Sequence, residues 1–90
     1  MKLNPDFILQ EMGGEAVLVP TGEAGERFRG IVHLNETAAF IIERLKTETT
    51  QEKTVNALLS EYEVSREVAE KNVAAIIAQL REIGALSETS

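Results

Sequence analysis

The sequence predicts an α+β fold in which an N-terminal three-stranded antiparallel sheet is followed by three helices. Before Leu34, apolar and polar residues alternate as they do in strands, whereas after Asn35 the apolar residues recur at helical spacing. The pair Gly13–Gly14 separates the first two apolar runs, which is typical of a tight hairpin turn because glycine adopts positive φ at little cost. The sheet therefore gives way to helices at Asn35, a residue type that is preferred at helix N-caps.

The hairpin accounts for two strands, over residues 7–12 and 15–19, and Pro20 ends the second one. Residues 21–26 are polar and include two glycines, so they are expected to form a loop. The third strand is expected over residues 27–34. Its alternation places Phe28, Gly30, Val32 and Leu34 on one face and Arg27, Arg29, Ile31 and His33 on the other.

The first helix is expected over residues 36–46 and the second over 51–62, where Thr49 begins a capping-box pattern. Ser65 is expected to cap a third, longer helix that ends at Gly84. The apolar stripe of that helix comprises Ala69, Val73, Ile76, Leu80 and Ile83, with Ile77 at its margin and the small residues Ala74 and Ala78 beyond it. The predicted core includes Leu34, Phe40, Leu45, Leu58, Val73 and Leu80.

The composition fits one soluble domain of 90 residues and excludes several functions. Apolar residues make up 43% of the chain and charged residues 27%, which are ordinary values for a globular protein. The chain has no cysteine, which excludes a disulfide scaffold, a thiolate metal site and a cysteine nucleophile. No stretch has the length of a signal peptide's apolar core or of a membrane span, so we expect a cytoplasmic protein without a membrane partner.

The net charge of −6 argues against a nucleic-acid partner. Acidic residues outnumber basic ones both before and after Leu34, and no basic stripe interrupts them. The affinity of proteins for nucleic acids comes largely from neutralised phosphates, which an acidic surface repels. We therefore expect no nucleic acid among the partners.

Residues that could carry out catalysis are scarce. A catalytic site requires converging groups, and the chain has one histidine, no cysteine, no glycine-rich phosphate loop and no pair of histidines at metal-ligand spacing. His33, the lone imidazole, is most simply a surface or packing residue of the third strand. We therefore predict that the protein is not an enzyme and holds no cofactor or metal.

Arg27 and Arg29 form the one local basic feature, two residues apart on the strand face that also carries Ile31 and His33. Two interpretations stay open. Charged residues on an edge strand discourage edge-to-edge aggregation. Alternatively, the edge is a docking site at which an extended peptide adds a strand while the arginines hold its acidic side chains.

Three segments and their order resemble a known family. They are NPDFILQEMGGEAVLV near the start, HLNETAAFIIERL at the change from sheet to helix, and LREIGAL at the end of the last helix. In these segments the chain is similar to the pyrroloquinoline quinone synthesis protein D (PqqD) family, also called the RiPP recognition element. The resemblance implies a winged-helix-like arrangement in a single peptide-binding domain over residues 1–90, with an ordered core of about 4–86 and no catalytic activity.

Members of that family bind the leader segment of a ribosomally made precursor peptide. The resemblance implies that the peptide lies as an added strand against the third strand, packs on the third helix, and is presented to a modifying enzyme, often a radical S-adenosylmethionine (radical SAM) enzyme. Carried onto this sequence, the groove is lined by Arg27, Arg29, Ile31 and His33 from the strand and by Lys71, Ala74, Ile77, Ala78 and Arg81 from the helix.

Two alternatives stay open at this point. A winged-helix DNA-binding regulator would read DNA through the third helix, but the exposed face expected there carries Arg66, Glu67, Glu70 and Lys71, whose charges cancel. A scaffold subunit would instead bind only a partner enzyme. Competition by a leader peptide separates that alternative from a leader-binding module.

Overall fold

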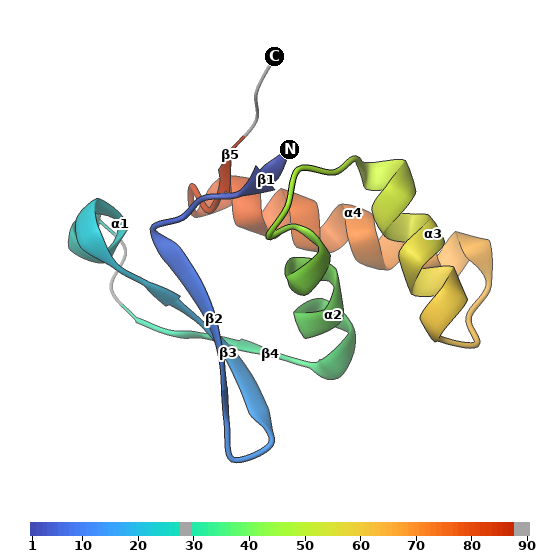
Figure 1. Cartoon of the computed structure of the whole chain (residues 1–90), viewed down its shortest axis with the longest axis horizontal. Coiled ribbons are helices and arrows are strands. Elements are labelled where there is room, and N and C mark those ends of the chain that lie inside the picture. Colours follow the sequence, from blue (N-terminus) through green and yellow to red (C-terminus); the bar gives the residue numbers. More distant parts are fainter. Residues whose placement is uncertain (28–29, 88–90) are drawn as a thin grey trace.

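The computed structural model describes residues 1–27 and 30–87 (Figure 1). The elements in chain order are β1 (Lys2–Leu3), β2 (Phe7–Met12), β3 (Glu15–Pro20), α1 (Gly22–Arg27), β4 (Val32–Leu34), α2 (Glu36–Arg44), α3 (Gln51–Glu61), α4 (Arg66–Glu82) and β5 (Leu86–Ser87). Strands β2, β3 and β4 form an antiparallel sheet in the order β2-β3-β4, and α2, α3 and α4 follow it in the chain. The predicted α+β class is confirmed.

The β2–β3 hairpin turns at the Gly13–Gly14 pair, as predicted. Pairing runs from Phe7 opposite Pro20 to Met12 opposite Glu15, which leaves only the two glycines in the loop. Their φ angles are +59° and +84°, values that residues with a Cβ rarely adopt. The turn geometry therefore explains both glycines without a bound ligand.

The segment between β3 and β4 contradicts the sequence prediction. The sequence predicts a loop over residues 21–26 and a strand over 27–34, whereas the chain forms α1 in the first stretch and pairs with β3 only at the end of the second. Ala24 explains the helix, because its side chain is 2% exposed and packs in the core, where it anchors this polar segment. Phe28, which the prediction places on the third strand, lies outside the described residues.

Arg27 consequently loses its predicted place on a strand. Arg27 ends α1 and is exposed, and Arg29 lies outside the described residues. The predicted alternation holds for the last three residues of the segment, because Val32 and Leu34 are half-buried and His33 is exposed. The strand is thus correctly oriented but much shorter than expected.

Side-chain caps begin α2 and α4 as predicted. Asn35 Oδ1 accepts a hydrogen bond from the Ala38 N–H at 2.7 Å. Ser65 Oγ caps α4 in the same way, accepting from the Val68 N–H at 3.2 Å. Helix α4 ends just before Gly84, whose φ of +75° suits the left-handed turn that closes many helices.

The predicted cap of the second helix is wrong by one residue. Thr50, not Thr49, caps α3, and its Oγ1 accepts a hydrogen bond from the Lys53 N–H at 3.1 Å. The Thr49 N–H instead donates to the Met1 carbonyl at 3.0 Å. That bond to the start of the chain holds Thr49 outside the helix. No pattern in the sequence predicts this bond.

The two ends of the described chain pair with each other, which the sequence does not predict. β1 and β5 form a two-stranded antiparallel sheet through the pairs Lys2–Ser87 and Leu3–Leu86. The Leu3 N–H also donates to the Leu45 carbonyl at 2.7 Å, which fastens the start of the chain to the end of α2. Strands of two residues are too short to show a period in the sequence.

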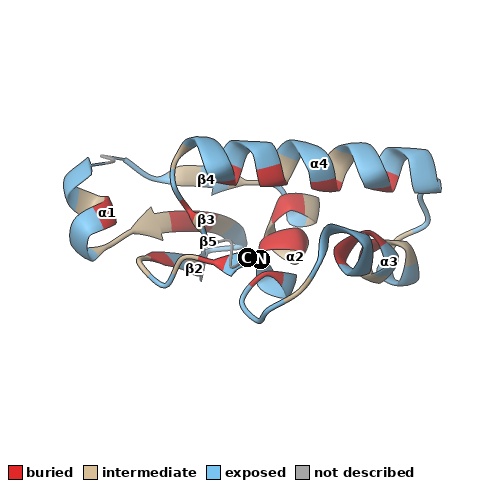
Figure 2. Ribbon diagram, turned by 90° about the horizontal axis from the view of Figure 1, so that it is seen from above, coloured by how far each residue is buried: buried red, intermediate tan, exposed pale blue. Residues whose placement is uncertain are grey.

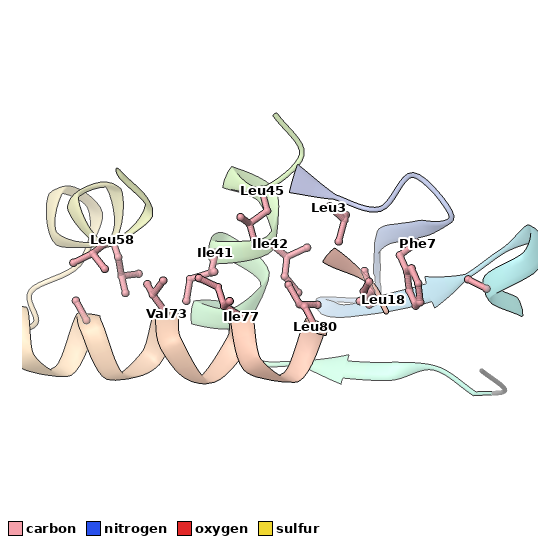
Figure 3. Close-up of a cluster of buried hydrophobic side chains, with 14 residues drawn as sticks. Leu3, Phe7, Leu18, Ile41, Ile42, Leu45, Leu58, Val73, Ile77 and Leu80 are labelled. Atoms are coloured by element: carbon pink, nitrogen blue, oxygen red, sulfur yellow. The ribbon is translucent and has the colours of Figure 1, made fainter. Parts of the chain in front are cut away.

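The core lies between the inner face of the sheet and the helices α2, α3 and α4 (Figure 3). Figure 2 shows buried residues along the side of α4 that faces α2 and α3. The largest fully buried apolar side chains are Leu18, Ile41, Ile42, Leu45, Leu58, Ile77 and Val73. Of the predicted core residues, Leu45, Leu58, Val73 and Leu80 are buried, whereas Leu34 and Phe40 are half-buried.

Candidate functional site

The free edge of β4 is the first feature of the candidate site. Within the described residues β4 pairs with β3 alone, so the backbone groups on its other side have no strand partner. An edge of this kind accepts an added strand, which is the physical basis of peptide binding by sheet extension. The edge is short, with three residues from Val32 to Leu34.

The two faces of β4 differ in character. Val32 and Leu34 are half-buried and pack against the core, whereas His33 is exposed and stands opposite Val17 on the outward face of the sheet. A strand added beside β4 would turn alternate side chains to these same two sides. The edge therefore offers an inner, apolar side and an outward side.

The long helix α4 is the second feature. In the view of Figure 2, β4 lies at about the level of α4, and the other two strands of the sheet lie below it. The free edge of β4 is thus on the side of the molecule where α4 lies. With 17 residues, α4 extends well past the short strand in both views.

The predicted groove residue Ile77 is a core residue, and the prediction is wrong for it. Its side chain is 1% exposed and belongs to the buried stripe with Ala69, Val73 and Leu80. Ile77 follows Val73 by four residues and precedes Leu80 by three, so it occupies the middle of that stripe. Ile76, which the prediction places in the stripe, is half-buried at its margin.

The other predicted groove residues of α4 are exposed: Lys71, Ala74, Ala78 and Arg81. Helical spacing puts all four on one side of the buried stripe. Ile76 and Ile83, seven residues apart, lie on the opposite side and are half-buried. The helix therefore has one exposed flank of small and basic residues and one apolar flank that the core covers only in part.

The predicted strand contacts are only partly brought together. His33 lies on β4, and Ile31 directly precedes the strand and is 54% exposed. Arg27 belongs to α1 instead. The interpretation in which two strand arginines hold an acidic peptide therefore lacks Arg27 as a strand residue.

Four half-buried apolar residues on β4 and on the apolar flank of α4 are not among the residues of the groove prediction. These are Val32, Leu34, Ile76 and Ile83. Their spacing in the sequence predicts core residues. It does not predict that their side chains are only half-buried.

A separate cleft of about 450 Å³ lies between the end of the hairpin and α2. Its lining includes Glu11, Glu15, Glu36, Glu43, Phe40 and Tyr62. The rings of Phe40 and Tyr62 meet edge to face, with their centroids 5.5 Å apart. Partial burial, followed by the charges of Glu36 and Glu61, raises the pKa of Tyr62 above its ordinary value of 10.0.

Two further findings concern the residues that the structure describes. No group of three or more His, Cys, Asp or Glu side chains among them is placed to hold a metal ion. None of the helices formed by residues 1–27 and 30–87 combines the length and the apolar character needed to cross a bilayer.

The fold and the site define a class of protein: a small α+β module that offers a free edge strand on the side of a long helix. The chain belongs to the family of Coenzyme PQQ synthesis protein D (PqqD), whose model matches residues 15–86. The predicted family is therefore confirmed.

Two solved structures are similar over nearly the whole chain. TbiB1 in complex with the TbiA(beta) leader peptide has a TM-score of 0.79 and 21% identity, over 100% of this chain and 99% of that one. Lasso peptide synthetase B1 complexed with the leader peptide has a TM-score of 0.74 and 32% identity, over 97% of this chain and 96% of that one. No curated protein matches the chain.

Proposed function

We propose that this chain is a non-catalytic recognition module. It binds the leader segment of a ribosomally synthesised precursor peptide by strand addition at β4 and presents the precursor to a modifying enzyme, often a radical SAM enzyme. The free edge of β4 is the observation that carries the proposal. Membership of the PqqD family and the leader peptides bound in both similar structures support it.

Strand addition gives the peptide two kinds of contact. Backbone hydrogen bonds to β4 supply affinity whatever the peptide sequence, and side chains supply specificity. The inner side chains of the peptide meet Val32 and Leu34, which are apolar and half-buried. Its outward side chains lie beside Ile31 and His33, both exposed.

Helix α4 offers the peptide two flanks. The exposed flank contains the contacts predicted from the sequence, Lys71, Ala74, Ala78 and Arg81. We assign the inner side chains of the peptide to the other flank, with Ile76 and Ile83, because half-buried apolar surface gains free energy when it is covered. The exposed flank remains the competing proposal.

The charges of α4 do not favour DNA as the ligand. Arg66 donates to Asn56 Oδ1 at 2.8 Å and lies 3.7 Å from the Glu70 carboxylate. Lys71 lies 3.6 Å from the Glu67 carboxylate. A phosphate that approaches this face would therefore meet a carboxylate beside each cation, and the repulsion would weaken binding.

A ¹H-¹⁵N NMR titration with the leader segments of short peptides encoded beside the gene tests the proposal. We expect a micromolar or tighter Kd, about −8 kcal/mol or better, with shifts at residues 31–34. A well-folded spectrum that does not change with any of these peptides at tens of micromolar would overturn it.

Methylation of single backbone nitrogens in the bound peptide tests the strand geometry. Every second N–H of an added strand points to β4, so methylation should weaken binding about tenfold, or about 1.4 kcal/mol, at alternate positions only. An unmethylated peptide is the control. Losses that do not alternate would contradict strand addition even for a peptide that binds.

A further inference from the structure

Apolar side chains form a row across the outward face of the sheet. Ile8 on β2 stands opposite Val19 on β3. The β3–β4 register ends at the pair Leu18–Val32, and the next residues beyond that pair are Val19 on β3 and Ile31, directly before β4. The residues Ile8, Val19 and Ile31, called the outward row, therefore run from the far strand to the free edge of β4.

Both ends of the outward row are exposed. Ile8 is 43% exposed and Ile31 is 54% exposed, and Met12, on the same face of β2, is 65% exposed. These three side chains expose apolar surface to water on one face of the sheet, with Gln10 between Ile8 and Met12 on β2. The row is thus a surface that a partner could cover.

The outward face is nearly free of charge. Its remaining strand residues are Gln10, Val17 and His33, and Glu15 at the hairpin turn is the acidic residue that the described strands place there. The whole chain, in contrast, carries a net charge of −6. A nearly neutral apolar face on an acidic chain is therefore better suited to form the apolar centre of a protein interface than to bind a charged ligand.

We propose that this outward face docks the enzyme that modifies the precursor, and that a bound leader peptide completes the docking surface. The inference rests on the proposed function. A strand added at β4 turns every second side chain outward, and the one that stands beside Ile31 extends the outward row beyond the edge. An enzyme on this face would contact the module and the peptide together.

A second copy of the chain is the competing occupant. A stable dimer buries about 800 Å² on each partner, so it would have to cover much polar surface around the exposed apolar side chains of this face. Two copies that each carry −6 also repel one another. A transient complex with an enzyme requires less surface, and it allows the precursor to leave after modification.

The composite surface implies coupling between the two partners. If the enzyme contacts both module and peptide, the peptide raises the affinity of the module for the enzyme. The enzyme then raises the affinity of the module for the peptide by the same factor. We expect a factor of about ten, within the range of ordinary coupling free energies.

Two substitutions, Ile8→Glu and Met12→Glu, test the assignment on β2, the strand farthest from the β4 edge. Val68→Glu on α4 is the matched control, because Val68 is 45% exposed. The probes are the leader segment that binds in the titration and the purified modifying enzyme encoded beside the gene. Biolayer interferometry measures the Kd of each probe for the wild type and for each variant. Circular dichroism shows whether the variants are folded.

Both sheet variants should bind the peptide within about twofold of wild type and lose at least about tenfold in affinity for the enzyme with peptide present, or about 1.4 kcal/mol. The control should keep both affinities. Enzyme affinity retained in both sheet variants overturns the proposal, and so does the absence of a wild-type complex with the enzyme when peptide is bound.

Sedimentation velocity tests the competing occupant. A wild-type dimer that Ile8→Glu dissociates assigns the outward face to a second copy and overturns the proposal, whereas a monomer supports it. Failure of the wild type to bind any leader peptide overturns the proposed function and the composite surface with it. The measurement with peptide alone, without the enzyme, distinguishes that outcome from a failure of enzyme docking.

Discussion

The Asn35 side chain and the Ala38 backbone are joined by a 2.7 Å hydrogen bond where the sheet gives way to the helices. The bond satisfies one of the N–H groups that the start of a helix leaves without an intrahelical partner. It also begins α2 directly after β4, so that the edge strand and the helical layer are joined by a single residue.

Asn35→Ala should lower the free energy of unfolding by about 1 kcal/mol, because the substitution removes the cap and leaves the Ala38 N–H without its acceptor. Asn35→Asp should retain stability, since a carboxylate accepts the same bond and favours a helix N-terminus. Urea unfolding of the three proteins measures both effects. Equal losses for the two variants would contradict the capping role.

Ile77→Ala should cost about 2 to 5 kcal/mol of unfolding free energy, because it opens a cavity in the centre of the core. Ile76→Ala, its neighbour at the margin of the buried stripe, should cost clearly less since water already reaches that side chain. Thermal and urea unfolding compare the two variants. A larger loss for Ile76→Ala would restore the sequence prediction that Ile76 is the core residue.

The parts of the fold that follow from neighbouring residues are predictable from the sequence. Asn35 is a cap because of the helix that follows it, and Gly13–Gly14 form a turn because only glycine adopts both φ angles cheaply. Ala24 and Leu3 are different. Their roles depend on contacts with distant residues, such as the bond from the Leu3 N–H to the Leu45 carbonyl, and local patterns do not encode them.

The candidate site was predictable to a similar extent. The alternation of Val32, His33 and Leu34 is correct because it follows from the period of a strand. The choice between Ile76 and Ile77 fails because both lie within an apolar stripe, and the centre of that stripe is set by where α2 and α3 lie. Which strands form the two edges, β2 and β4, is likewise a property of the whole sheet.

Tyr62 should make the protein less stable at alkaline pH. Its pKa in the folded state is raised above 10.0 by partial burial and by Glu36 and Glu61. The unfolded chain therefore releases the proton at lower pH than the folded protein, and the free energy of unfolding falls as the pH rises above the pKa of the unfolded state. Stability from this group is fully present below that pH.

Tyr62→Phe removes the titrating group and keeps the ring that packs against Phe40. Its unfolding free energy should fall less than that of wild type between about pH 9 and pH 11, the range in which an unfolded tyrosine titrates. Urea midpoints measured along this range provide the comparison. Parallel curves for the two proteins would show that Tyr62 does not contribute to the alkaline loss.

The flank of α4 that meets the peptide is tested by substitutions on opposite sides of the buried stripe. Ile83→Asn and Ile76→Asn remove apolar surface from the proposed contact, and they should weaken leader binding about tenfold, or about 1.4 kcal/mol each. Ala78→Asn, on the exposed flank, is the control and should leave the Kd unchanged. Titration of folded variants below their melting temperatures separates binding from stability. Weakened binding by Ala78→Asn alone would assign the contact to the exposed flank, because only a peptide packed against that side would be displaced by a larger polar side chain there.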